Sequence, residues 1–238
     1  MAPESVSHEQ DEIEGQNAAT TDFRQPPSQA VVDLLGVLTY GELTAFDRLA
    51  EDARLAPTMA GRAALAQMAA AEIGHFTRLR EHLTSIGVDP DQAMAPFVAV
   101  FDAFHESTRP STWLEGLVKV YVGDGLGTDF YREVAQFVDP STRQLVLEVL
   151  ADTGHAEFAV REVRAAMQAD PVVGGRLALW ARRLVGEALT QAQRVVAERD
   201  NLTDLVIEGS GDLVGIGSLI KRITSAHAER MKTLGLSS

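Results

Sequence analysis

The sequence carries the same short pattern twice: a carboxylate followed three residues later by a histidine. The first copy is Glu72-Ile73-Gly74-His75 and the second, eighty residues on, is Asp152-Thr153-Gly154-His155. Residues i and i+3 lie on one face of an α-helix about one turn apart, so each pair can hold the same metal ion. One such pair arises by chance in many helical proteins, whereas a repeated pair is a much stronger indication of a metal site.

A further acidic residue precedes each copy at a matching distance. Glu42 lies 30 residues before Glu72 (72 − 42), and Asp124 lies 28 residues before Asp152 (152 − 124). An antiparallel helix pair returns to the same height after about that many residues, because an α-helix rises about 1.5 Å per residue. We therefore expect Glu42 to face the first copy and Asp124 to face the second. The six predicted metal ligands are Glu42, Glu72, His75, Asp124, Asp152 and His155.

The simpler alternative places these residues on solvent-facing helix stripes. Buried acids with no metal would cost several kcal/mol, so burial of the set would favour a metal site. Glycines also stand beside all four elements, at Gly41, Gly74, Gly123 and Gly154. Glycine costs about 1 kcal/mol in a helix interior, so these four predict tight packing or backbone adjustment around a centre.

Composition limits the metals and the fold. Apolar residues make up 45% of the 238, aromatic residues only 6%, and no period-2 runs stand out, which is typical of an all-α protein. The chain has no cysteine, which excludes thiolate catalysis, iron–sulfur clusters and thiolate zinc sites. Oxygen and imidazole ligands suit iron, with manganese as the alternative.

The net charge of −13 opposes non-specific binding to nucleic acid. No run approaches the roughly 18 apolar residues of a membrane span, and the polar, acidic N-terminus does not have the pattern of a signal peptide. We therefore expect a cytoplasmic protein with no membrane partner.

Helix-breaking proline and glycine residues, together with helix-capping residues, predict the domain organisation. Residues 1–27 are expected to form a disordered acidic tail, followed by one helical domain over residues 28–238. A four-helix core over residues 28–169 would be a duplicated helical hairpin, joined by a long crossover at residues 88–110 that holds a short helix. Its helices are expected at about 28–54, 58–86, 111–138 and 140–169. Additional helices are expected at 171–200 and from 213 or 217 to 234, with a loop at 209–217.

Four other residues could act near such a centre. Tyr121 and Tyr131 lie one and two turns from Asp124, and each could be a hydrogen-bonding or redox residue, although core packing is the commoner role. Glu187 repeats the glycine–acid pairing and could be an extra ligand. His227 could line a partner site, with packing of the C-terminal helix as the alternative.

With these motifs, the sequence resembles the ferritin-like superfamily of di-iron carboxylate proteins, and more narrowly the actinobacterial ferritin-like proteins grouped with MiaE-type tRNA hydroxylases. The resemblance covers about residues 30–235. It rests on Tyr40-Gly41-Glu42-Leu43, Glu72-Ile73-Gly74-His75-Phe76, Tyr121-Val122-Gly123-Asp124-Gly125, Asp152-Thr153-Gly154-His155-Ala156 and Leu184-Val185-Gly186-Glu187-Ala188.

The resemblance implies two iron ions, with one histidine on each. Glu42 and Asp124 would be terminal ligands, and Glu72 and Asp152 would bridge the two ions. Aspartate stands at two positions where the superfamily has glutamate, and each aspartate reaches one methylene less far. The second ion is therefore expected to sit differently, to bind more weakly or to be absent.

Three functions remain open from the sequence. The first is an oxygen-activating hydroxylase or monooxygenase that uses dioxygen and an electron donor, acting on modified tRNA or on a small apolar molecule. The second is a ferroxidase or iron-handling protein, for which iron(II) is the substrate. The third is a non-catalytic helical scaffold with a degenerate metal site. A homodimer is compatible with all three.

Overall fold

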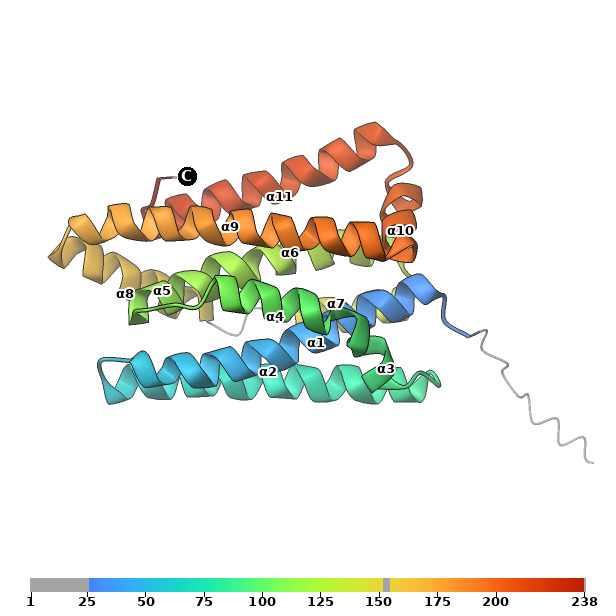
Figure 1. Cartoon of the computed structure of the whole chain (residues 1–238), viewed down its shortest axis with the longest axis horizontal. Helices are drawn as coiled ribbons and strands as arrows, with labels where there is room; N and C mark the ends of the chain where they lie inside the picture. Colours follow the sequence, from blue (N-terminus) through green and yellow to red (C-terminus); the bar gives the residue numbers. More distant parts are fainter. Residues whose placement is uncertain (1–25, 152–154, 238) are drawn as a thin grey trace, which may run out of the picture.

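The computed structural model describes residues 26–151 and 155–237, apart from the side chain of His155. Every regular element in these residues is helical (Figure 1). The predicted all-α class is confirmed, whereas the tail predicted for residues 1–27 lies almost wholly outside the described residues. Within the described part, no helix combines the length and the apolar character needed to cross a membrane.

The first two helices form the predicted antiparallel hairpin. α1 spans Gln29–Asp52, a short 3₁₀ turn follows at Ala53–Leu55, and α2 spans Met59–Ser85. Thr58 ends the turn and caps α2, because its hydroxyl oxygen accepts a hydrogen bond from the backbone N–H of Gly61 at 3.1 Å. The two helices lie side by side along one edge of the molecule, so residues about thirty positions apart share a level (Figure 1).

The crossover contains more helix than predicted. It holds α3 at Pro90–Met94, a 3₁₀ turn at Ala95–Phe97, and α4 at Val98–Ser107. α3 lies against α1 at Gly36, where a Cβ atom would clash with the backbone carbonyl of Ala93. Position 36 therefore requires glycine for the crossover to pack against α1.

The third long helix is continuous but irregular. α5 (Trp113–Val118) runs into a π-helical segment, η3 (Lys119–Asp124), then into α6 (Gly125–Val134) and a 3₁₀ turn at Ala135–Phe137. The sequence predicted one regular helix here. The π-helical segment ends at the predicted ligand Asp124, and such segments are frequent at functional sites.

The fourth helix is not continuous, which corrects the prediction of one helix over 140–169. α7 spans Pro140–Val149, and a separate helix, α8, begins at His155 and ends at Ala169. Leu150 ends α7, and its carbonyl accepts a hydrogen bond from Nη2 of Arg132 on α6 at 2.7 Å. In a continuing helix this carbonyl would accept a hydrogen bond from the backbone N–H four residues later. Here Arg132 of the neighbouring helix supplies the donor instead.

The C-terminal third forms α9 (Val172–Glu198), α10 (Asp200–Ser210) and α11 (Leu213–Leu234). The predicted loop at 209–217 was wrong, because only Gly211 and Asp212 separate α10 from α11. Gly211 takes a positive φ of 80°, and the Asp212 side chain caps α11 through the backbone N–H of Gly215 at 2.8 Å. α9 packs on α4, α5 and η3, so the added helices cover the side of the bundle away from α2 (Figure 1).

The main hydrophobic core joins both ends of the chain. Leu49 of α1, Leu65 of α2, Leu117 of α5, Leu184 of α9 and Met231 of α11 are almost completely buried in one cluster. Each fully buried aliphatic side chain stabilises the fold by roughly 1.5–3 kcal/mol. This shared core fixes the relative positions of the helices that carry the predicted ligands.

Candidate metal centre

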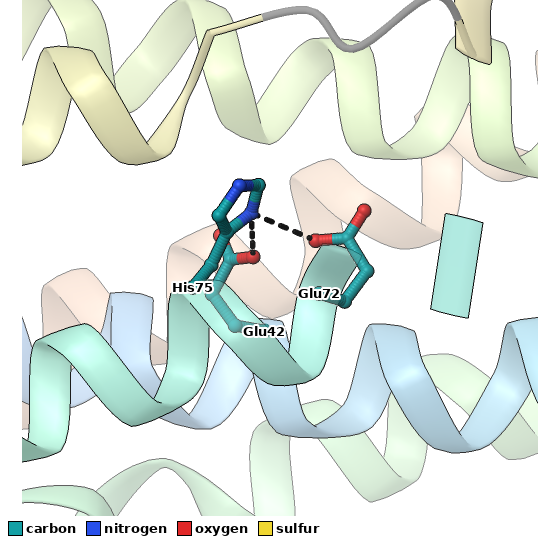
Figure 2. A group of neighbouring side chains, drawn as sticks. All are labelled: Glu42, Glu72 and His75. Carbon is teal, nitrogen blue, oxygen red and sulfur yellow. Dashed lines mark hydrogen bonds and ion pairs between the residues drawn. The ribbon is translucent and has the colours of Figure 1, made fainter. Parts of the chain in front are cut away.

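Three of the six predicted ligands meet between α1 and α2. Nδ1 of His75 lies 3.2 Å from Oε2 of Glu42 and 3.4 Å from Oε2 of Glu72. Figure 2 shows the imidazole of His75 turned toward both carboxylates. The predicted facing of Glu42 and the first acid-x-x-His copy is confirmed.

Local burial makes this cluster electrostatically unusual. Glu42 is only 8% exposed, and this burial raises the pKa of its carboxyl group. Hydrogen bonding of the protonated imidazole to the carboxylates of Glu42 and Glu72 raises the pKa of His75. Without a cation the three side chains therefore retain a proton that the unfolded chain would release near neutral pH. The solvent-facing alternative does not describe Glu42, because its side chain is in the interior.

The arrangement fits a metal ion. One potential ligand atom from each of Glu42, Glu72 and His75 lies within 4.8 Å of the other two. Two carboxylate oxygens and one imidazole nitrogen form a donor set suited to iron or manganese. A divalent cation at this point would replace the shared proton and compensate the buried carboxylate charge. Glu42, Glu72 and His75 could thus hold one ion.

The second half of the predicted centre is described only at Asp124. Asp124 is an exposed residue at the end of η3, yet the protein atoms around its carboxyl group still raise its pKa to about 7, chiefly by desolvation. The charge of Glu72 is the next contribution, which places Asp124 in the electrostatic field of the first cluster. Asp152 and the side chain of His155 lie outside the described residues. One regular helix was predicted to carry Asp152 and His155. Instead α7 ends at Val149, and α8 begins at His155.

The glycines predicted to pack tightly around the centre do not do so. Among the described residues, a Cβ atom on Gly74 would meet nothing within 4 Å, and one on Gly41 or Gly123 would make only ordinary contacts, at 3.4 and 3.8 Å. Gly154 lies outside the described residues. Tight packing is therefore not found at these three glycines, whereas Gly123 lies in the π-helical segment η3, which is a backbone irregularity of the kind that the pattern also allowed.

The secondary candidates differ in their surroundings. Burial, with a smaller contribution from Glu42, raises the pKa of Tyr131, so its phenol keeps its proton beside the cluster. Tyr121 packs against the main hydrophobic core, as the packing alternative predicted. Glu187 is half-buried on α9. Desolvation, with the charge of Arg230, lowers the pKa of His227, which lies half-buried on α11.

The sequence reasoning did not identify a second group of buried polar residues. Asp52, His105 and Lys119 are each less than 9% exposed and lie where α1, α4 and η3 meet. One signal was present, since Lys119 stands inside the apolar run Leu117–Val122. A lysine in such a run is either buried or marks a break in the pattern.

Comparisons with known proteins agree with this fold. A family model described as "Ferritin-like domain, actinomycetes" matches residues 26–209. Among solved structures, the chain is similar to a Synechococcus protein described as having aldehyde deformylating oxidase activity. The TM-score is 0.68 at 19% identity, over 88% of this chain and 91% of that one. Among curated proteins, none matches. The predicted ferritin-like fold is confirmed, while the narrower resemblance to tRNA hydroxylases stays a prediction.

Proposed function

Since the chain belongs to the actinomycete ferritin-like family, we propose that it is a metal-dependent oxidoreductase that uses dioxygen to oxidise a small apolar organic molecule. The observation that carries the proposal is the convergence of Glu42, Glu72 and His75 from two antiparallel helices on one buried point. Packing alone does not account for this cluster, because taking the carboxyl group of Glu42 out of water costs stability.

The proposed centre holds two iron ions, with manganese as the alternative metal. Glu42, Glu72 and His75 would hold the first, while Asp124, Asp152 and His155 would hold the second. Bound iron would supply the capacity to bind and reduce dioxygen. An external electron donor would complete the reaction.

The protein's own side chains would control charge and protons at this centre. Glu42 gives a buried negative charge that favours a cation over a proton once the metal is supplied. The phenol of Tyr131 stays protonated because burial and Glu42 raise its pKa, so it can donate a hydrogen bond toward the centre. Desolvation, followed by the charge of Glu72, raises the pKa of Asp124 to about 7, so a cation beside Asp124 would also compete with a proton.

The small-molecule substrate is favoured over tRNA by charge. A net charge of −13 opposes a polyanion, whereas it does not affect a neutral substrate. The Synechococcus protein, which shares the fold, is described as having aldehyde deformylating oxidase activity, and aldehydes are organic compounds without a net charge. This supports the same broad class of substrate for the present chain.

The test combines metal content with dioxygen consumption. Protein produced with iron should contain two ions per chain, and a reduced sample should consume dioxygen. Glu72→Ala should lose both ions, since the ferritin-like resemblance implies that Glu72 is a ligand shared by both. Glu81→Ala removes an exposed carboxylate from the same helix and should change neither reading.

Other results would select another function. Repeated oxidation of many iron(II) ions per chain would favour the iron-handling function. Absence of bound metal after loading would favour the scaffold. His155→Ala should reduce the content from two ions to one, and an unchanged content would exclude His155 as a ligand.

A further inference from the structure

A second buried polar site shares the η3 segment with the proposed ligand Asp124 but is lined by none of the six proposed metal ligands. Asp52 ends α1, His105 lies near the end of α4, and Lys119 begins η3. These three residues line a cavity of about 140 Å³. Arg48, four residues before Asp52 on the same helix (52 − 48), lines it as well.

The cavity is positively charged, although the protein is strongly acidic. Its lining includes four cationic side chains and two carboxylates, which gives a formal charge of 4 − 2 = +2. Of the carboxylates, Glu51 is already paired with Arg48 at 2.9 Å and Arg54 at 3.8 Å. Burial is the main factor that lowers the pKa of Lys119, to about 8, so this lysine stays mostly charged at neutral pH.

Several polar groups in the cavity lack a protein partner. His105 is only 8% exposed, and neither of its ring nitrogens has a hydrogen-bond partner among the residues that the structure describes. Nε of Arg48 is likewise buried without a partner. Phe104 packs edge-to-face on the His105 ring at 5.3 Å between centroids, so the ring is held in place. A buried polar group left without a partner costs about 1–3 kcal/mol, which a bound ligand would recover.

We propose that this cavity binds a small carboxylate, held by the charges of Lys119 and Arg48 and by a hydrogen bond from His105. Lys119 donates to the Thr108 carbonyl at 3.0 Å, which fixes its ammonium group at the cavity wall. Burial, followed by the charges of Lys119 and Arg48, lowers the pKa of His105 to about 3, so the ring is neutral and offers one N–H.

Charge and apolar lining favour a carboxylate over phosphate, and size favours a short one. The volume of about 140 Å³ is below the range of roughly 300–1,000 Å³ typical of drug-sized ligands. Asp52 faces the same cavity, and its negative charge would repel a dianion more strongly than a monoanion. Leu55 and Pro110 supply apolar wall for a short alkyl group.

The test is a titration of the full-length protein with sodium acetate at pH 7, at an ionic strength held constant with sodium chloride. The ring C–H resonances of His105, assigned with His105→Gln, report on the cavity directly. We expect them to shift saturably, with a dissociation constant on the order of millimolar. Sodium phosphate, titrated in parallel, should bind more weakly.

Two arginine variants separate the site from general electrostatics. Arg48→Gln should weaken acetate binding about tenfold, because it removes a charge-assisted hydrogen bond. Arg164→Gln removes the same charge from an exposed position on α8 and should leave the affinity within about twofold. If Arg48→Gln does not fold, Arg54→Gln, whose side chain is 69% exposed, should still weaken binding severalfold. Absence of a saturable shift, tighter binding of phosphate, or equal weakening in Arg164→Gln would overturn the proposal.

Discussion

Nδ1 of His75 lies 3.2 Å from Oε2 of Glu42, although the two residues are 33 positions apart in the chain. The turn between α1 and α2 sets this distance, since it returns the chain antiparallel at the same level. A metal ligand set therefore depends on the register of one hairpin. Substitutions that alter the hairpin register should therefore change the metal affinity. Substitutions of the cluster residues themselves should change the proton affinity of the metal-free site.

Metal binding at this cluster should release protons. The pKa of His75 is raised by its hydrogen bonds to Glu42 and Glu72, and burial raises the pKa of Glu42. A metal needs these ligands deprotonated, so manganese(II) affinity should rise as pH increases from 6 to 8, by on the order of tenfold per unit for each proton released. Calorimetry in two buffers of different ionisation enthalpy counts the protons. Equal heats in both buffers would contradict this prediction.

Without metal, the same protons should make stability fall as pH rises. The folded pKa of His75 lies above its unfolded value of about 6.5, so its contribution is complete below that pH and is lost as pH rises through the folded pKa. Glu42 acts in the same direction, because its buried carboxyl group must ionise as pH rises.

Urea unfolding of metal-free protein at pH 6 and pH 8.5 measures this loss. His75→Gln should make the free energy of unfolding less dependent on pH. His82→Gln, two turns further along α2, is the matched control and should keep the pH dependence of the unchanged protein. If the free energy of unfolding depends on pH equally in both variants, His75 is not the source of the pH dependence.

The hairpin and half of the candidate site could be predicted from sequence because both depend on local rules. The rise per residue places Glu42 opposite His75, and Thr58 and Asp139 mark helix starts by side-chain hydrogen bonds. These signals need no knowledge of the rest of the fold. The facing of Glu42 and His75 and the starts of α2 and α7 are accordingly confirmed.

What could not be predicted depends on contacts between distant elements. The break after Val149 is accompanied by a hydrogen bond from Arg132 to Leu150, which no local pattern encodes. The π-helical segment that begins at Lys119 also has no local punctuation in the sequence. Glycine illustrates the same limit, because the close helix contact lies at Gly36 and not at Gly74.

The two glycines should respond oppositely to alanine. Gly36→Ala places a Cβ against the Ala93 carbonyl, and such overpacking should destabilise the protein by about 1–3 kcal/mol. Gly74→Ala meets open space inside a helix and should stabilise the protein by about 1 kcal/mol. Thermal and urea unfolding of both variants checks the signs. Destabilisation by Gly74→Ala would restore the idea that the site needs glycine there.

Arg199 holds the start of α10 against α1 through a buried ion pair with Asp33. The Asp33 side chain is 2% exposed, Nε of Arg199 lies 3.2 Å from its Oδ2, and the guanidinium also contacts Oδ1. Gln29 donates a further hydrogen bond to Asp33 at 2.8 Å. Arg199→Met leaves the aspartate buried without its counter-charge, so it should destabilise the protein by about 3 kcal/mol.

Arg222→Met is the matched control, since Arg222 pairs with Glu133 at 2.7 Å but stands on the surface. An exposed pair contributes little, so the control should unfold at nearly the urea concentration of the unchanged protein. Adding Asp33→Asn to Arg199→Met should recover part of the loss, because the amide removes the uncompensated buried charge. Equal midpoints for Arg199→Met and Arg222→Met would show that burial of Asp33 does not make its partner important, and that α10 is held on α1 by apolar contacts alone.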